Sequence, residues 1–164
     1  MRVLPAAAGS ALFFALAPGG VAGLIPWILT GWHSRPLGEL GIPVRVVGLA
    51  LLVTGMTVLL RAFGRFVHEG LGTPAPLAPP EHLVVGGLYR YVRNPMYLAV
   101  LATIVGQALV LGQFGLLWYG AAVFAAVSMF VHGYEEPALS RRFGDEYARY
   151  RKEVRRWRPS RPSR

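Results

Sequence analysis

The stretch NPMYLAVLATIVGQALVLGQFGLLWYGAAVFAAVSMFVHGY, residues 94–134, decides the fold of this chain. It contains no Asp, Glu, Lys or Arg, and its length is enough for two membrane-spanning helices of about 20 residues each. The sequence Gly112-Gln113-Phe114-Gly115 lies near its middle and is typical of a tight turn between helices. The stretch therefore predicts an antiparallel hairpin of two membrane-spanning helices, 95–112 and 115–133.

Two more apolar runs precede the hairpin. Residues 3–30 carry no charged side chain, and residues 42–60 carry only Arg45. Together with the hairpin, these runs predict an all-α integral membrane protein with about four transmembrane helices, at 5–30, 42–62, 95–112 and 115–133.

The N-terminus admits two interpretations. Arg2, the apolar residues after it and Ala15-Leu16-Ala17 fit a signal peptide with its cleavage site. The apolar run continues to Thr30, well past that site, and this length favours a retained helix. Cleavage would remove one span and leave the orientation of the others unchanged.

The composition of the whole chain also favours a membrane protein. Hydrophobic residues make up 54% and charged residues 15% of the 164 residues, whereas soluble domains carry about 25% charged residues. The absence of cysteine excludes disulfides, thiolate metal sites and cysteine nucleophiles. We expect one membrane domain, 1–164, made of two N-terminal helices (1–70), a connector and the hairpin (71–134), a glutamate pair with an amphipathic helix (135–158) and a tail (159–164).

The uneven distribution of Lys and Arg predicts the orientation. With both termini in the cytoplasm, all basic residues lie inside except Arg35 and Arg45. Because cytoplasmic loops carry an excess of Lys and Arg, we expect a protein of the inner membrane with both termini cytoplasmic. A basic, apolar chain favours a membrane over nucleic acid as its partner, and no nucleic-acid partner is expected.

The C-terminal region predicts an amphipathic helix over residues 137–157. A stripe of apolar and aromatic side chains at helical spacing runs through Leu139, Phe143, Tyr147, Tyr150, Val154 and Trp157. Basic residues occupy much of the remaining helix surface, which suits a membrane with anionic lipids. If the tail only holds the membrane, other basic sequence would replace residues 151–156 with little loss. Residues 158–164 are expected to be disordered.

Folding the run 94–134 about its glycine turn brings polar side chains together at one cytoplasmic end. Residues equally distant from the turn lie at equal depth, so that Glu135 falls opposite Val92 and Arg93, and Tyr97 opposite Phe130. The converging side chains are Arg93, Asn94, Tyr97, Tyr134, Glu135 and Glu136, beside the turn Gly86-Gly87-Leu88-Tyr89. Carboxylates with several tyrosines favour a cation or a ribose diol. The four histidines lack metal-site spacing, so no metal is expected.

These residues resemble the signature of a known superfamily. Two segments carry the resemblance: LVVGGLYRYVRNPMY at residues 83–97, and the later pattern Glu135-Glu136, Leu139, Phe143-Gly144, Tyr147 and Tyr150. Both are similar to isoprenylcysteine carboxyl methyltransferases and phospholipid methyltransferases, and the resemblance covers residues 80–158. It implies an integral-membrane enzyme that transfers a methyl group from S-adenosylmethionine to a lipid or another apolar small molecule.

The resemblance also implies which residues bind the cofactor. In relatives, the cofactor is held by the stretch before a Gly-x-Tyr turn, by an Arg-His-Pro-x-Tyr motif and by the first of two glutamates. The matching positions here are Leu83, Val84, Tyr89, Asn94, Pro95, Met96, Tyr97 and Glu135.

Two positions depart from the superfamily's pattern. Asn94 stands in place of the motif's histidine, and since an amide does not titrate near neutrality, a histidine base is excluded there. Asn-Pro-Met-Tyr also resembles the phospholipid-methylating branch. Val131 stands where the prenylcysteine branch has an arginine that is thought to meet the substrate carboxylate, which argues against a prenylcysteine substrate.

Methyl transfer from a sulfonium mainly requires alignment of nucleophile, methyl group and leaving sulfur. An ammonium, phenol or thiol acceptor must also lose a proton. The nearby catalytic candidates for that step are Glu136, His132 and Tyr134.

Two other functions stay open at this point. Membrane sterol and steroid reductases carry a similar Arg-x-Pro-x-Tyr-like motif, so an NADPH-dependent reductase is one alternative. A non-catalytic membrane scaffold with a lipid-binding tail is the other, although a glutamate pair at the mouth of a hairpin gains nothing obvious from that role. Four helices can pack as one small bundle, so the sequence is compatible with a monomer and leaves the oligomeric state open.

Overall fold

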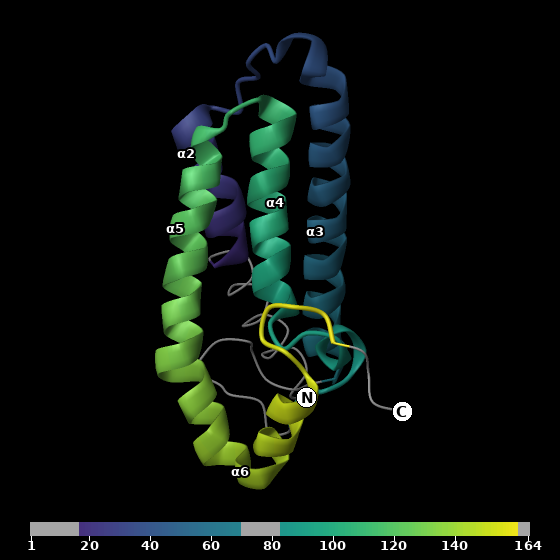
Figure 1. Cartoon of the computed structure of the whole chain (residues 1–164), viewed down its shortest axis with the longest axis vertical. Helices are drawn as coiled ribbons and strands as arrows, with labels where there is room; N and C mark the ends of the chain where they lie inside the picture. The colour runs from purple at the N-terminus through teal and green to yellow at the C-terminus, as the bar shows by residue number, and fades with distance from the viewer. Residues whose placement is uncertain (1–16, 70–82, 161–164) are drawn as a thin grey trace.

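The computed structural model describes residues 17–69 and 83–160, and all regular secondary structure in them is helical. Three long helices lie side by side along the long axis of the molecule: α3 (Gly41–Glu69), α4 (Pro95–Leu111) and α5 (Gly115–Phe130) (Figure 1). This arrangement confirms the all-helical architecture that the apolar runs predict. The proline-rich connector 71–80 lies outside the described residues.

The first described helix is short and irregular. A π-helical turn, η1 (Gly20–Leu24), leads into α2 (Ile25–Thr30), and Gly31 ends α2 in a left-handed conformation. Gln107 on α4 ties η1 to the bundle, since its Nε2 donates a hydrogen bond of 2.6 Å to the carbonyl oxygen of Ala22. The predicted helix 5–30 is thus helical in its described part, and the signal-peptide interpretation concerns residues that lie outside it.

α3 follows a short 3-10 turn, η2 (Gly38–Leu40), and packs closely against α4. The contact depends on glycine: a Cβ on Gly106 would lie 2.7 Å from the backbone nitrogen of Leu52 and 2.8 Å from the carbonyl oxygen of Gly48. Small residues allow helix backbones to approach in this way within membranes. α3 extends past the predicted limit of 62 to Glu69, because no proline interrupts it before that point.

α4 and α5 form the predicted hairpin. Gly112 ends α4 with a φ of +65°, a conformation that glycine adopts without Cβ strain, and α5 begins three residues later at Gly115. The helix then continues beyond Phe130 through a second π-helical turn, η4 (Val131–Glu135), into α6 (Glu136–Glu153). The glutamate pair therefore lies at the open end of the hairpin, opposite the glycine turn.

Length and apolar character identify two helices in the described residues as able to cross a membrane, Gly38–Ala62 and Gly115–Glu153, and two shorter apolar helices, Gly20–Thr30 and Pro95–Leu111. Large apolar side chains are well exposed on their outer surfaces; Trp118 is 82% exposed and Met129 is 70% exposed. An apolar outer surface of this extent fits contact with lipid. The chain is thus a membrane protein, whereas four spans and their orientation stay predictions.

α6 is not the continuous helix that the stripe predicts. Gly144, with a φ of 49° and a ψ of −121°, breaks it, and the second half of α6 turns back toward the lower end of α4 (Figure 1). The helix ends at Glu153, and Tyr147 and Val154 are buried in protein at 3% and 6% exposure. The prediction of one surface helix over 137–157 is wrong, because periodicity does not reveal a glycine that reverses the chain.

Candidate active site

A cavity of about 870 Å³ lies at the open end of the hairpin, within the usual range of ligand sites, roughly 300–1,000 Å³. Its polar part is lined by Arg93, just before α4, and Tyr97, in the first turn of α4. Glu135 at the end of η4 and Glu136 at the start of α6 complete this part. Its apolar part lies between η1, α4 and α5, where the lining side chains include Pro18, Val21, Val100, Val123, Ala126 and Val127. The cavity thus joins charged groups to an apolar space between helices.

Most of the predicted site residues line this cavity. Seven of the eight predicted cofactor-binding residues do so: Leu83, Val84, Tyr89, Asn94, Met96, Tyr97 and Glu135. Pro95 does not; it is buried as the first residue of α4, where its fixed φ suits a helix start. Of the catalytic candidates, Glu136 and Tyr134 line the cavity, whereas His132 is exposed and does not line it.

Glu135 and Tyr97 meet directly, because the Tyr97 Oη donates a hydrogen bond of 3.0 Å to the Glu135 Oε2. The rule that residues equally distant from the turn lie at equal depth would place Tyr97 beside Phe130 instead. That position is more than one helical turn from Glu135. The offset follows from helix geometry, since side chains lean toward the N-terminus of their own helix. In an antiparallel pair, Tyr97 leans toward the open end and Glu135 leans inward. The bond fixes one carboxylate oxygen at the cavity wall.

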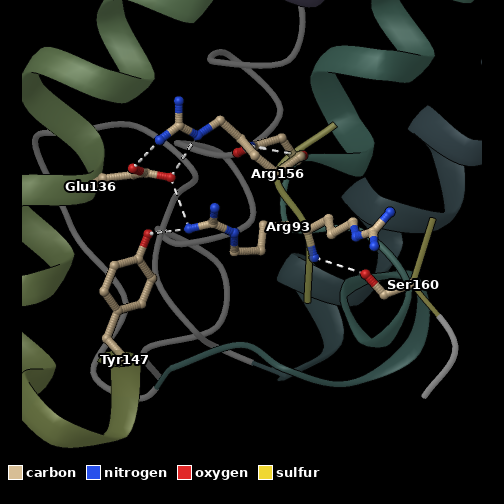
Figure 2. Close-up of polar contacts among 7 residues, drawn as sticks. Arg93, Glu136, Tyr147, Arg156 and Ser160 are labelled. Atoms are coloured by element: carbon tan, nitrogen blue, oxygen red, sulfur yellow. Dashed lines mark hydrogen bonds and ion pairs between the residues drawn. The ribbon is translucent and has the colours of Figure 1, made fainter. Parts of the chain in front are cut away.

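Glu136 lies between two arginines (Figure 2). Its Oε1 is 2.8 Å from the Nη1 of Arg93, and the Nη2 and Nε of Arg156 reach its two oxygens at 2.5 and 2.9 Å. The three side chains are largely buried, with exposed fractions of 7% for Glu136, 11% for Arg93 and 26% for Arg156. Such charge-assisted, bidentate contacts are the strong hydrogen bonds of proteins. Glu136 therefore holds a segment near the C-terminus against the start of α4.

Residues 154–160, here called the C-terminal strap, lie across the segment before α4. The backbone N–H of Arg93 donates a hydrogen bond of 3.0 Å to the carbonyl oxygen of Arg155, and the N–H of Ser160 donates one of 2.6 Å to Tyr91. The amide of Asn94 donates a hydrogen bond of 3.4 Å to the carbonyl oxygen of Arg156. Within the stretch expected to be disordered, Ser160 thus has a defined place, because its backbone N–H is hydrogen bonded; residues 161–164 lie outside the described part of the chain.

Two tyrosines of α6 complete the cavity after the Gly144 break. Tyr150 donates a hydrogen bond of 2.8 Å to the carbonyl oxygen of Tyr89, and the hydroxyl of Tyr147 accepts one of 3.4 Å from Arg93 (Figure 2). Both side chains line the cavity. They act as hydrogen-bonding walls of the cavity.

The contacts of Arg156 argue against the expectation that other basic sequence could replace residues 151–156. Its guanidinium is the one in this stretch that contacts Glu136, and its carbonyl oxygen binds Asn94. Sequence reasoning missed it because the tail contains many arginines and the Gly144 reversal decides which of them faces the cavity. The only signal in the sequence is that the buried acid Glu136 needs a cationic partner.

Comparisons with known proteins identify the family of this chain. The phospholipid methyltransferase family matches residues 43–146, more than half of the chain. A stretch of 63 residues, 38% of this chain, is 43% identical to an uncharacterized protein of Haemophilus influenzae and covers 98% of that protein. No solved structure matches the chain. The resemblance predicted from residues 83–97 and the glutamate pair is confirmed: the chain belongs to the phospholipid methyltransferase family and, as such, is a membrane methyltransferase.

Proposed function

We propose that this protein transfers a methyl group from S-adenosylmethionine to a lipid or another apolar small molecule. One observation carries the proposal: a single cavity joins the Glu135–Tyr97 pair to an apolar space between η1, α4 and α5. A charged cofactor fits the first part and an apolar acceptor fits the second. The membership of the phospholipid methyltransferase family supports both assignments.

The groups at the polar end fit the chemistry of S-adenosylmethionine. The cofactor carries cationic groups, a ribose diol and a carboxylate. The Glu135 carboxylate suits a cation or the diol, and tyrosine faces attract cations by about 0.5–2 kcal/mol. The buried Nε of Arg93 donates to no acceptor in the described residues. Because an unpaired buried donor costs about 1–3 kcal/mol, an anionic group of a ligand is a suitable complement for this side of the cavity.

The bound cofactor would supply an already activated methyl group. The task of the protein is then alignment: Tyr97 fixes the Glu135 carboxylate, and Leu83, Val84 and Met96 offer apolar surface beside it. Glu136 already accepts hydrogen bonds from two guanidiniums, so we assign it to positioning of the strap. Tyr134 lines the cavity, and half of its surface is exposed. It is the remaining candidate for contact with the acceptor.

The proposal includes the arrangement in the membrane. The apolar runs favour four spans. The distribution of arginine favours an orientation with both termini and the strap at the cytoplasmic face of the inner membrane. An apolar acceptor then enters sideways between helices, and the cofactor enters from water. The division of the cavity into a polar part and an apolar part supports these two routes. One chain supplies all the residues named here, which suits a monomer.

Calorimetric titration of the detergent-purified protein with S-adenosylmethionine tests the proposal. The wild type is expected to bind, and Glu135→Gln and Tyr97→Phe are expected to weaken binding about tenfold or more, since each breaks the charged hydrogen bond at the cavity wall. Glu146→Gln, an exposed acid on α6, is the matched control and is expected to bind as the wild type does. Folded protein that binds NADPH and not S-adenosylmethionine would overturn the proposal and select a reductase.

A further inference from the structure

The segment that closes the cavity has a basic outer face. Between residues 145 and 158 the exposed cationic side chains are Arg149, Arg151, Lys152, Arg155 and Arg158. The exposed acids in the same stretch are Asp145, Glu146 and Glu153. Five cations therefore stand against three acids on this face, which all comes after the Gly144 reversal and carries a net positive charge.

The inner face of the same segment closes the cavity. Tyr147 and Val154 are buried, Tyr150 is hydrogen bonded to Tyr89, and Arg156 is paired with Glu136. The two faces share one backbone and also touch, because the guanidinium of Arg151 lies 5.9 Å from the centre of the Tyr147 ring. An outer cation and a residue that closes the cavity are therefore in contact.

The position of this face identifies its partner. The strap, drawn in yellow near the lower end of α4 in Figure 1, lies at the open end of the hairpin. The apolar part of α4 ends at the same level. In a membrane this level is the headgroup layer. A basic surface held there meets anionic lipid headgroups at very short range. Salt screens the attraction only weakly at distances within the Debye length, which is about 8 Å in physiological salt.

We propose that the basic outer face of residues 145–158 binds anionic lipid headgroups and that this contact holds the C-terminal strap closed over the cavity. The effect on the cofactor rests on the proposed function, whereas the contact with lipid does not. By linkage, anything that stabilises the closed strap raises the affinity for a ligand enclosed by it, and the ligand in turn stabilises the strap. The composition of the bilayer thereby regulates the methyltransferase.

The test compares two reconstitutions of the full-length protein, in vesicles of phosphatidylcholine alone and of equal parts phosphatidylcholine and phosphatidylglycerol. Hydrogen exchange of the amides of residues 145–160 reports closure without any cofactor. The variant Lys152→Gln/Arg158→Gln removes two outer cations, and Arg35→Gln/Arg45→Gln removes two exposed cations far along the chain. S-adenosylmethionine affinity is measured in the same samples.

Anionic lipid is expected to slow exchange in the wild type and in the Arg35/Arg45 variant. Each cation near an anionic surface contributes about fivefold to the attraction, so the Lys152/Arg158 variant is expected to lose about five- to 25-fold of this protection. Cofactor affinity is expected to follow the same order.

Equal exchange in the two lipids would overturn the proposal, whatever the cofactor does. Slower exchange with an unchanged cofactor affinity would overturn the coupling. Slower exchange with no cofactor binding in either lipid would overturn the proposed function and leave the lipid contact standing.

Discussion

Substitution Glu136→Gln tests whether the buried charges hold the strap in place. The change keeps the shape of the side chain and removes its charge, so that the guanidiniums of Arg93 and Arg156 face one another without a carboxylate between them. Breaking a buried ion pair costs about 3–5 kcal/mol. Because Arg156 is 26% exposed and water solvates part of it, we expect the lower end, about 3 kcal/mol.

Thermal unfolding in detergent measures this cost. For a chain of this length each kcal/mol lowers the melting temperature by roughly 2–4 °C, so Glu136→Gln is expected to lower it by about 6–12 °C. Arg156→Gln is expected to cost less, about 1.5–3 kcal/mol, since the contact of 2.8 Å between Arg93 and Glu136 remains. Glu146→Gln removes an exposed carboxylate from the same helix as a matched control, with an effect within about 0.5 kcal/mol.

Equal melting temperatures for Glu136→Gln and Glu146→Gln would refute the reasoning. A larger loss for Arg156→Gln than for Glu136→Gln would also refute it, because the carboxylate is the group that both arginines share.

Three further predictions concern the contact between α3 and α4 and the second half of α6. Gly106→Ala is expected to destabilise the protein by about 1–3 kcal/mol, since its Cβ would lie 2.7 Å from the backbone of α3. Gly133→Ala is the control, because a Cβ there would have no atom within 4 Å, and equal thermal stability of the two variants would contradict the prediction. Gly144→Ala places a Cβ at a φ of 49° and is expected to cost about 1–3 kcal/mol, seen as lower thermal stability and earlier proteolysis after residue 144; an unchanged digest would argue against the reversal. Tyr150→Phe removes the hydrogen bond to Tyr89 and is expected to cost about 1 kcal/mol in thermal unfolding, and a gain in stability would show that this bond is absent.

The hairpin could be predicted from sequence because its signals are local. A long run without charges and a glycine turn fix two antiparallel helices. The lean of side chains along each helix then brings Tyr97 to Glu135. The residues that resemble the superfamily's cofactor motif fall on the same cavity, with the exception of Pro95.

The closure of the site could not be predicted in the same way. A helical stripe such as Tyr147, Tyr150 and Val154 fits a lipid surface and a protein interior equally well, and the left-handed Gly144 decides between them. The partner of Glu136 depends on that reversal too, because only a returning chain brings Arg156 to it. Long-range pairing of this kind has no local pattern in the sequence.

The most direct test of the central claim is transfer of an isotopically labelled methyl group from S-adenosylmethionine to lipid. Purified protein is reconstituted in vesicles made from a bacterial lipid extract, and label in the organic phase is counted over time. The wild type is expected to transfer label, and Glu39→Gln, which removes an exposed acid on η2, is expected to transfer it equally. Glu135→Gln is expected to transfer less by a factor of about ten or more. Folded wild type that binds S-adenosylmethionine and leaves every lipid and apolar small molecule unlabelled would contradict the account.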